Sequence, residues 1–191
     1  MDLNLALFHG LNLGPGSPAW LMGVARFCST VLPAAALLGA LVLLPWRGAA
    51  GRRALGVTLL AILLAWLVAR GLSSAWPTPR PFALGLGHQG LAHKATASFP
   101  SSHASVAFAF GLALWARWPW RRGRWLPLLL AALVAWSRVA LGLHFPLDVL
   151  AGAFVGGLGA WLALRGLGKR AAGASALRPS GAVDERPVRT P

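Results

Sequence analysis

The sequence predicts an all-α protein, an integral-membrane helical bundle of five or six transmembrane helices, and three observations support that class. Hydrophobic residues make up 57% of the chain and charged residues only 12%, against roughly 25% charged residues in an ordinary soluble domain. Apolar runs recur with lengths close to the roughly 17–25 residues that cross a bilayer as a helix. The mean hydropathy is +0.63, and the basic residues gather in short segments between the runs.

Five apolar runs are the predicted spans, at residues 20–46, 54–72, 102–117, 125–142 and 147–167. Before them, residues 3–13 place leucines and a phenylalanine among polar positions, which predicts a short interfacial helix or a sixth span. The chain thus divides into an N-terminal interfacial segment (1–19), a membrane domain (20–170) and a tail (171–191). The tail is rich in Ala, Gly, Pro and Arg, which predicts a disordered cytoplasmic segment.

The last predicted span carries small residues at helical spacing, Gly152, Gly156 and Gly159. Small residues let helix backbones approach closely within a membrane. We expect this face to pack inside the bundle, with a dimer seam as the alternative. The sequence sets no oligomeric state.

The formal net charge of +14 predicts membrane topology and no nucleic-acid partner, because nucleic-acid binding needs a basic stripe on a soluble face. Short cytoplasmic loops are enriched in Lys and Arg. Three connections that fall on one side of the predicted bundle carry this enrichment: Arg47, Arg52 and Arg53; Arg117, Arg121, Arg122 and Arg124; and Arg165, Lys169 and Arg170. The connections at 73–101 and 142–147 are therefore predicted to face away from the cytoplasm.

Asp148 is the only carboxylate between residues 3 and 183, and it lies four residues after His144. Gly142 ends one predicted helix and Pro146 suits the first turn of the next, which places His144 in a tight outward turn. A carboxylate at that spacing can hydrogen-bond one ring nitrogen and leave the other free to attack a substrate. The alternative is a capping Asp beside a structural His.

Two further segments predict an anion site on the same side. Pro100 and Ser101 lead into a helix whose first turn holds His103, so free backbone amides and a proton donor face outward. The alternative is a capped helix with an interfacial His. Arg80 lies in a proline-rich, extended stretch, where its guanidinium can bind phosphate through two hydrogen bonds or serve only as an interfacial anchor. Arg138 adds a further basic group.

Taken in chain order, these segments resemble the signature stretches of the type 2 phosphatidic acid phosphatase superfamily, over about residues 70–152. The matching stretches are Arg80-Pro81, Pro100-Ser101-Ser102-His103, and Ser137-Arg138 followed by His144 and Asp148. The resemblance implies a helical membrane bundle with an outward-facing site that needs no metal and no cofactor. It also implies residue roles: His144 as nucleophile, Asp148 as its orienting partner, His103 as general acid, and Arg80, Ser101, Ser102 and Arg138 as the phosphate-binding residues.

Two positions depart from that family pattern. Ser73 stands where a Lys is usual, and Ser102 stands where a Gly is usual before the signature His. Arg70 or Lys94 is a candidate for the missing charge, although Arg70 also suits a span end and Lys94 a solvated loop position.

The Pro-Arg-Pro-Phe and Ser-Phe-Pro-Ser-Ser-His-Ala runs are most similar to the bacterial undecaprenyl-diphosphatase group. The resemblance implies hydrolysis of undecaprenyl diphosphate, through a phosphohistidine, at the outer or periplasmic face of the bacterial cytoplasmic (inner) membrane. Alternatives with the same residues are a broader lipid phosphate monoesterase, acting on phosphatidic acid, phosphatidylglycerophosphate or lipid A, and a lipid phosphotransferase. The third alternative is a non-catalytic lipid-phosphate binder or transporter. Such a protein would not need a nucleophile with an orienting carboxylate.

Overall fold

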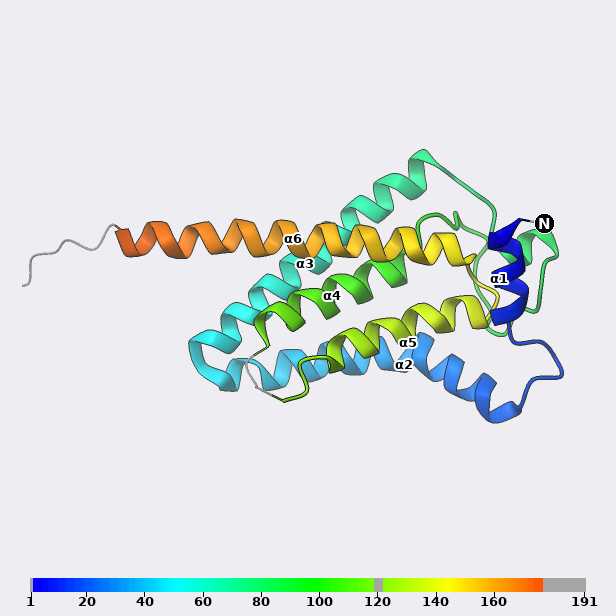
Figure 1. Cartoon of the computed structure of the whole chain (residues 1–191), viewed down its shortest axis with the longest axis horizontal. Helices are drawn as coiled ribbons and strands as arrows, with labels where there is room; N and C mark the ends of the chain where they lie inside the picture. Colours follow the sequence, from blue (N-terminus) through cyan, green and yellow to red (C-terminus); the bar gives the residue numbers. More distant parts are fainter. Residues whose placement is uncertain (1, 119–121, 177–191) are drawn as a thin grey trace, which may run out of the picture.

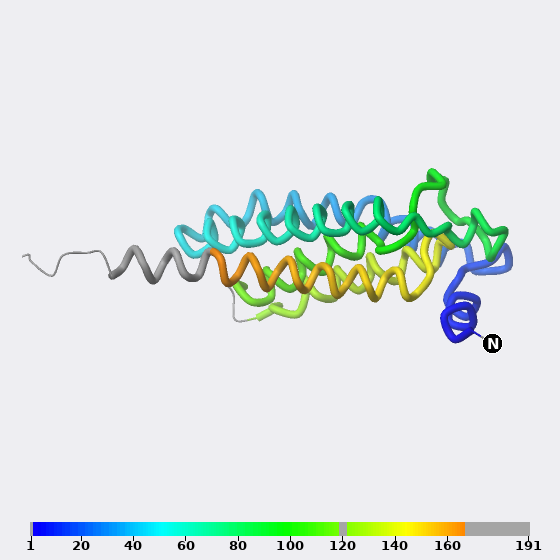
Figure 2. The backbone as a smooth tube through the Cα atoms, turned by 90° about the horizontal axis from the view of Figure 1, so that it is seen from above, coloured from blue at the N-terminus to red at the C-terminus, as the bar shows by residue number. Residues whose placement is uncertain are grey.

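The fold is an elongated bundle of helices, seen in a computed structural model that describes residues 2–118 and 122–176 (Figures 1 and 2). No residue in these two ranges forms a strand, in agreement with the predicted all-α class. The elements are α1 (Leu3–Leu11), α2 (Ala19–Leu43), the 3-10 turn η1 (Pro45–Arg47), α3 (Gly48–Ala75), the 3-10 turn η2 (Pro81–Leu84), α4 (Ser102–Arg117), α5 (Leu126–Ala140) and α6 (Pro146–Ala176).

Each predicted span coincides with one of the five helices α2 to α6. Within the described ranges, two helical stretches are long and apolar enough to cross a membrane: Ala19–Ala75, which includes α2, η1 and α3, and Pro146–Gly166. Leu126–Ala140 is a shorter apolar helix. The helical pattern is therefore confirmed, while the number of crossings stays a prediction. Helix α6 continues to Ala176, past the boundary expected at residue 170, and the rest of the expected tail lies outside the described residues.

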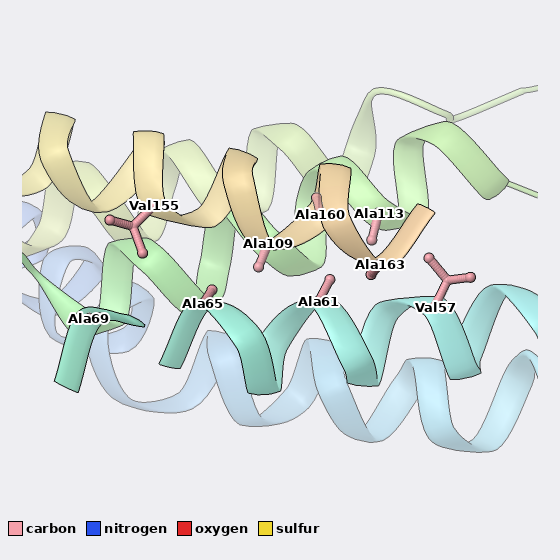
Figure 3. Close-up of a cluster of buried hydrophobic side chains, with 9 residues drawn as sticks. All are labelled: Val57, Ala61, Ala65, Ala69, Ala109, Ala113, Val155, Ala160 and Ala163. Carbon is pink, nitrogen blue, oxygen red and sulfur yellow. The ribbon is translucent and has the colours of Figure 1, made fainter. Parts of the chain in front are cut away.

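Helix α4 is the central helix of the bundle, because it packs against α3, α5 and α6, while α2 packs against α5. The fully buried residues of the α3–α4–α6 interface are small (Figure 3): Val57, Ala61, Ala65, Ala69, Ala109, Ala113, Val155, Ala160 and Ala163. Larger, partly buried residues, five of them leucines, pack around them. Lipid tails are as apolar as these side chains, so burial alone gives little reason for helices to associate in a membrane. Close approach and dispersion contacts between backbones supply the attraction instead.

The glycines of α6 lie where the backbone of α6 comes closest to the backbones of α4 and α3. A Cβ added to Gly152 would lie 2.6 Å from the carbonyl oxygen of Ser101, and one added to Gly156 would lie 2.5 Å from that of Ser105. A Cβ on Gly159 would lie 2.8 Å from the carbonyl oxygen of Ala61. The small-residue face is thus used inside the bundle, against α4 and α3, as expected.

The two ends of the bundle differ in chemistry. The α2–α3 turn, the C-terminal end of α4, the N-terminal end of α5 and the C-terminal half of α6 lie at one end (Figure 1). The basic residues predicted to be cytoplasmic lie in or next to these segments, except Arg121, which lies outside the described residues. The loop from residue 76 to 101, the turn at 141–145 and α1 lie at the opposite end. All residues predicted for the site belong to that opposite end.

Helix α1 is the predicted short helix, and it packs onto the ends of α5 and α6 (Figure 1). Phe8 is fully buried, with its ring 5.3 Å from that of Phe145. Just after α1, the side-chain amide of Asn12 donates to the carbonyls of His88 (3.0 Å) and Ala140 (3.1 Å) and accepts from the His88 amide (2.7 Å). These contacts fix the loop from residue 76 to 101 against the end of α5, beside the turn that carries His144.

We expect Gly156→Ala to lower the stability of the folded protein by about 1–3 kcal/mol, because its methyl group must displace α4 backbone. Gly157→Ala is the matched control, since its Cβ would have its nearest neighbour at an ordinary 3.6 Å. Thermal unfolding in detergent measures both. Equal midpoints for the two variants would show that the α4–α6 approach is not tight.

Candidate active site

Arg80 is held in place by backbone carbonyls from two other segments. Flanking prolines keep it extended (φ −82°, ψ 157°), and its side chain is buried. Its Nε donates to the carbonyl of Thr96 (2.9 Å), Nη2 to that of Ala97 (3.1 Å) and Nη1 to that of Leu143 (3.0 Å). Burial lowers the pKa of Arg80, and the charge of Asp148 opposes that shift. The guanidinium stays charged and fixed.

His144 receives a hydrogen bond from this arginine. Nη1 of Arg80 lies 3.0 Å from Nε2 of His144. A guanidinium can only donate, so Nε2 must be the accepting nitrogen and a neutral ring must carry its proton on Nδ1. Burial lowers the pKa of His144; Asp148 opposes the shift, and the positive charges of Arg80 and Arg138 reinforce it. His144 is therefore neutral at pH 7, with the Nε2 lone pair facing a cation.

Asp148 approaches His144 less closely than the sequence predicted. Its Oδ2 lies 3.6 Å from Nδ1 of His144, which is an ion-pair distance but too long for a hydrogen bond. The Ser98 hydroxyl lies near both groups, donating to Oδ2 at 2.6 Å and standing 3.3 Å from Nδ1. The amide of Phe145 also donates to Oδ2 (2.9 Å). The carboxylate is thus well satisfied, and the expected direct bond is replaced by a contact through a serine.

Arg138 and Ser101 retain buried polar atoms without partners. Nη1 of Arg138 donates to the Ser29 hydroxyl at 2.5 Å, while its Nε and Nη2 have no partner among residues 2–118 and 122–176. Ser101 occupies the N-cap position of α4 as expected, but its hydroxyl makes no capping bond and has no partner in the described part of the chain. Its amide instead donates to the carbonyl of Asp148 (3.0 Å). Unpaired buried donors are costly, and an anion would satisfy these.

Ser102 and His103 line an apolar groove of about 360 Å³ between α2, α3, α4 and α5. His103 lies close enough to Arg138 and His144 for their charges to act on its ring. The other groove-lining residues include Pro33, Trp66, Phe110 and Val134. A group held at this end of the groove would have a polar side toward the arginines and an apolar side toward the helices.

The structure thus gathers the predicted residues at one end of the bundle, through different contacts. Arg80 bonds His144 directly, and Asp148 reaches His144 through Ser98. The Arg138 side chain bonds α2, and Ser102 and His103 face the groove. Within residues 2–118 and 122–176, no three His, Cys, Asp or Glu side chains are grouped as metal ligands.

Sequence reasoning missed four side chains around this cluster. Ser98 and Thr96 bond the central groups, Ser29 holds Arg138, and His93 lies within electrostatic range of both arginines. Burial lowers the pKa of His93, and its hydrogen bond to the Lys94 carbonyl opposes the shift. The available signal for Ser29 was a polar residue inside an apolar span, which usually faces the bundle interior.

Ser73 stands where the family pattern usually has Lys, and it is hydrogen-bonded to the loop before α4. Its hydroxyl donates to the carbonyl of Phe99 (3.1 Å). The two candidates for the missing charge, Arg70 and Lys94, are both exposed. The cluster therefore contains two buried arginines and one buried carboxylate, which favours an anion.

We expect Ser29→Ala to weaken binding of orthovanadate, a phosphate mimic, by about tenfold, because Arg138 loses the hydrogen bond to Ser29 that orients its guanidinium. Thr30→Ala is the matched control, since that exposed hydroxyl bonds the Arg26 carbonyl of its own helix. Calorimetric titration in detergent measures both affinities. Unchanged affinity in Ser29→Ala would mean that Arg138 is oriented by packing alone.

Comparison with known proteins places the chain in a family. The sequence profile of the PAP2 superfamily matches residues 54–172. YbjG of Escherichia coli, provisionally named an undecaprenyl-diphosphatase, is 37% identical over 161 residues, which cover 83% of this chain and 79% of YbjG.

Two solved structures share the fold. LpxE of Aquifex aeolicus matches with a TM-score of 0.66 and 24% identity, over 86% of this chain and 96% of LpxE. A transmembrane PAP2-type phosphatidylglycerolphosphate phosphatase of Bacillus subtilis matches with a TM-score of 0.64 and 21% identity, over 87% of this chain and 85% of the other. The predicted family is confirmed: the chain belongs to the PAP2 superfamily and is a membrane-embedded lipid phosphatase.

Proposed function

We propose that this enzyme hydrolyses undecaprenyl diphosphate to undecaprenyl phosphate and inorganic phosphate through a phosphohistidine on His144. The observation that carries the proposal is a neutral His144 whose Nε2 faces Arg80, next to the unpaired donors of Arg138 and Ser101. An oxyanion placed there meets fixed donors on one side and a nitrogen lone pair on the other. That arrangement suits phosphoryl transfer, in which positioning and charge stabilisation supply most of the catalysis.

The first step is an in-line displacement. Nε2 of His144 forms a bond to the terminal phosphorus, the bond from that phosphorus to the bridging oxygen breaks, and His103 gives its proton to the leaving lipid phosphate. Arg80 transfers its Nη1 hydrogen bond from Nε2 to a phosphoryl oxygen as the lone pair becomes a bond. The ring becomes positively charged, and the carboxylate of Asp148 stabilises it.

The second step returns the enzyme to its starting state. His103, now neutral, takes a proton from water as the water oxygen attacks the phosphohistidine. The bond from phosphorus to Nε2 breaks, inorganic phosphate leaves, and His144 regains its lone pair. The arginines and Ser101 hold the same phosphoryl oxygens in both steps, with Ser102 beside them.

The apolar groove supports a substrate with a long hydrocarbon chain. A second hollow of about 160 Å³ shares Ala36, Phe110 and Leu130 with the groove and continues along α2, α4 and α5 toward Trp118. An isoprenoid chain whose phosphate lies at His103 would lie along this path. The similarity to YbjG supports the same substrate class.

The proposed location is the bacterial cytoplasmic (inner) membrane, with the site facing the periplasm or cell exterior. The support is that basic connections lie at the end of the bundle away from His144 (Figure 1), and Lys- and Arg-rich short loops remain cytoplasmic. A site on the outer face would regenerate the carrier lipid for cell-envelope polysaccharides such as peptidoglycan.

One observation favours a second function, a broader lipid phosphate monoesterase. Ser73 is uncharged where the family usually has Lys, and a monoester carries less negative charge than a diphosphate. A diphosphate has the better leaving group, however, and leaving-group quality acts on the chemical step itself. An exposed charge contributes about 1 kcal/mol or less, so we favour the diphosphate.

We expect His144→Ala to abolish phosphate release and to form no labelled phosphoenzyme, because no other group is placed to accept the phosphoryl group. His103→Ala should still be labelled by p-nitrophenyl phosphate, whose leaving group needs no proton. An alkaline quench, in which phosphohistidine is stable, followed by ³²P counting measures both, with His9→Ala on α1 as a distant control. Normal turnover by His144→Ala would exclude the phosphohistidine mechanism.

We expect the wild-type enzyme to prefer undecaprenyl diphosphate over phosphatidic acid and phosphatidylglycerophosphate by at least about tenfold in kcat/KM, or roughly 1.4 kcal/mol at the transition state. Phosphate release from each lipid in the same detergent micelles gives the ratio. A glycerophospholipid monoester with an equal or higher kcat/KM would replace the diphosphatase proposal with the monoesterase.

A further inference from the structure

Ser98 lies at the centre of the contacts around the proposed nucleophile. Its side chain is fully buried, and its hydroxyl lies 2.6 Å from Oδ2 of Asp148 and 3.3 Å from Nδ1 of His144. Its amide donates to the carbonyl of Thr78 (2.9 Å), and the next amide, that of Phe99, donates to the Thr78 hydroxyl (3.1 Å). The backbone of Ser98 is thus fixed against the extended segment that leads to Arg80.

The contacts that link Arg80, His144, Ser98 and Asp148 form a series in which each donor has a defined acceptor. Arg80 donates to Nε2, so the neutral ring of His144 carries its proton on Nδ1. A distance of 2.6 Å is typical of a hydroxyl that donates to a carboxylate, so the Ser98 proton points at Asp148. A serine oxygen also has two lone pairs, and one of them is available to the Nδ1 proton. The contact therefore runs from Nδ1–H to the hydroxyl and from the hydroxyl to the carboxylate.

The direct path from ring to carboxylate is longer than either contact through the serine. At 3.6 Å, Oδ2 attracts the Nδ1 proton by charge but does not fix the direction of the N–H bond. The backbone of Ser98 is held by its bond to Thr78, and its hydroxyl is held by its short bond to Asp148, so the serine oxygen supplies that direction. Hydrogen bonds in a chain also polarise one another in a low-dielectric interior.

We propose that Ser98 is a positioning residue of this enzyme, whose hydroxyl links Asp148 to His144 and orients the ring for attack by Nε2. The proposal rests on the proposed role of His144 as nucleophile. Positive charge develops on the ring as the phosphohistidine forms, and the polarised hydroxyl passes part of the stabilisation from the carboxylate to Nδ1–H. The effect belongs to the chemical step, because the hydroxyl of Ser98 bonds Asp148 and lies beside His144, and Ser98 is not one of the residues that line the groove.

The central test compares Ser98→Ala, Ser98→Thr and Ser98→Val with the wild type. Thr keeps the hydroxyl, and Val has nearly the shape of Thr without it, so the Thr and Val pair isolates the hydroxyl even if Ser98→Ala does not fold. Ser105→Ala is the matched control, because Ser105 is equally buried and its hydroxyl bonds the Ser101 carbonyl at 3.0 Å. Thermal unfolding of all variants reports the purely structural effect.

We expect Ser98→Ala and Ser98→Val to lower kcat at least about tenfold with KM changed by less than about twofold, and to slow phosphoenzyme formation by the same factor. Ser98→Thr should retain kcat within about threefold of the wild type.

Three results would overturn the proposal. They are a wild-type kcat in Ser98→Ala, equal kcat values in the Thr and Val variants, or losses of activity that follow the unfolding temperatures and also appear in Ser105→Ala. The His144→Ala labelling experiment separates the two levels of inference. An active His144→Ala would reject the nucleophile itself, whereas an inactive His144→Ala with a fully active Ser98→Ala would reject only the role of Ser98.

Discussion

The guanidinium of Arg80 is the contact on which the candidate site depends. It donates to carbonyls of Thr96, Ala97 and Leu143, and so joins the loop from residue 76 to 101 to the turn that carries His144. The same group donates to Nε2 of His144 and thereby selects the ring tautomer. Because guanidinium has five donors and no acceptor, one side chain can fix backbone geometry and chemical state together. The prolines beside Arg80 keep its backbone extended, which reduces the entropy lost in holding that position.

Helix packing and site geometry are linked through the start of α4. The amide of Ser101 donates to the carbonyl of Asp148, and Gly152 leaves room for the carbonyl of Ser101 on the α6 surface. A larger residue at Gly152 would separate α4 from α6, and with them His103 from Asp148. In a membrane, where apolar burial drives helices together only weakly, this close backbone approach supplies both stability and the relative position of the site residues.

The site concentrates buried polar groups that are individually costly. Arg80, Arg138, His144 and Asp148 are all buried, with two cations facing a single carboxylate. Such an arrangement is tolerated because backbone carbonyls and serine hydroxyls satisfy most of its donors. The remaining donors on Arg138 are available to bind an anion. The groove beside His103 is lined mostly by apolar side chains, which suits a lipid phosphatase.

The sequence by itself determined the elements and the local chemistry. Gly142 takes a positive φ of 71° and Pro146 begins α6, so the turn around His144 followed from residue type alone. Only the tertiary structure decided that Ser98, fifty positions from Asp148, lies beside both Asp148 and His144, and that Ser29 holds Arg138 across 109 positions. Spacing along one helix or turn limits which neighbours can meet. Contacts between distant segments depend on how whole helices pack, and the sequence pattern gives the apolar face of a helix but not the side chain opposite each polar group.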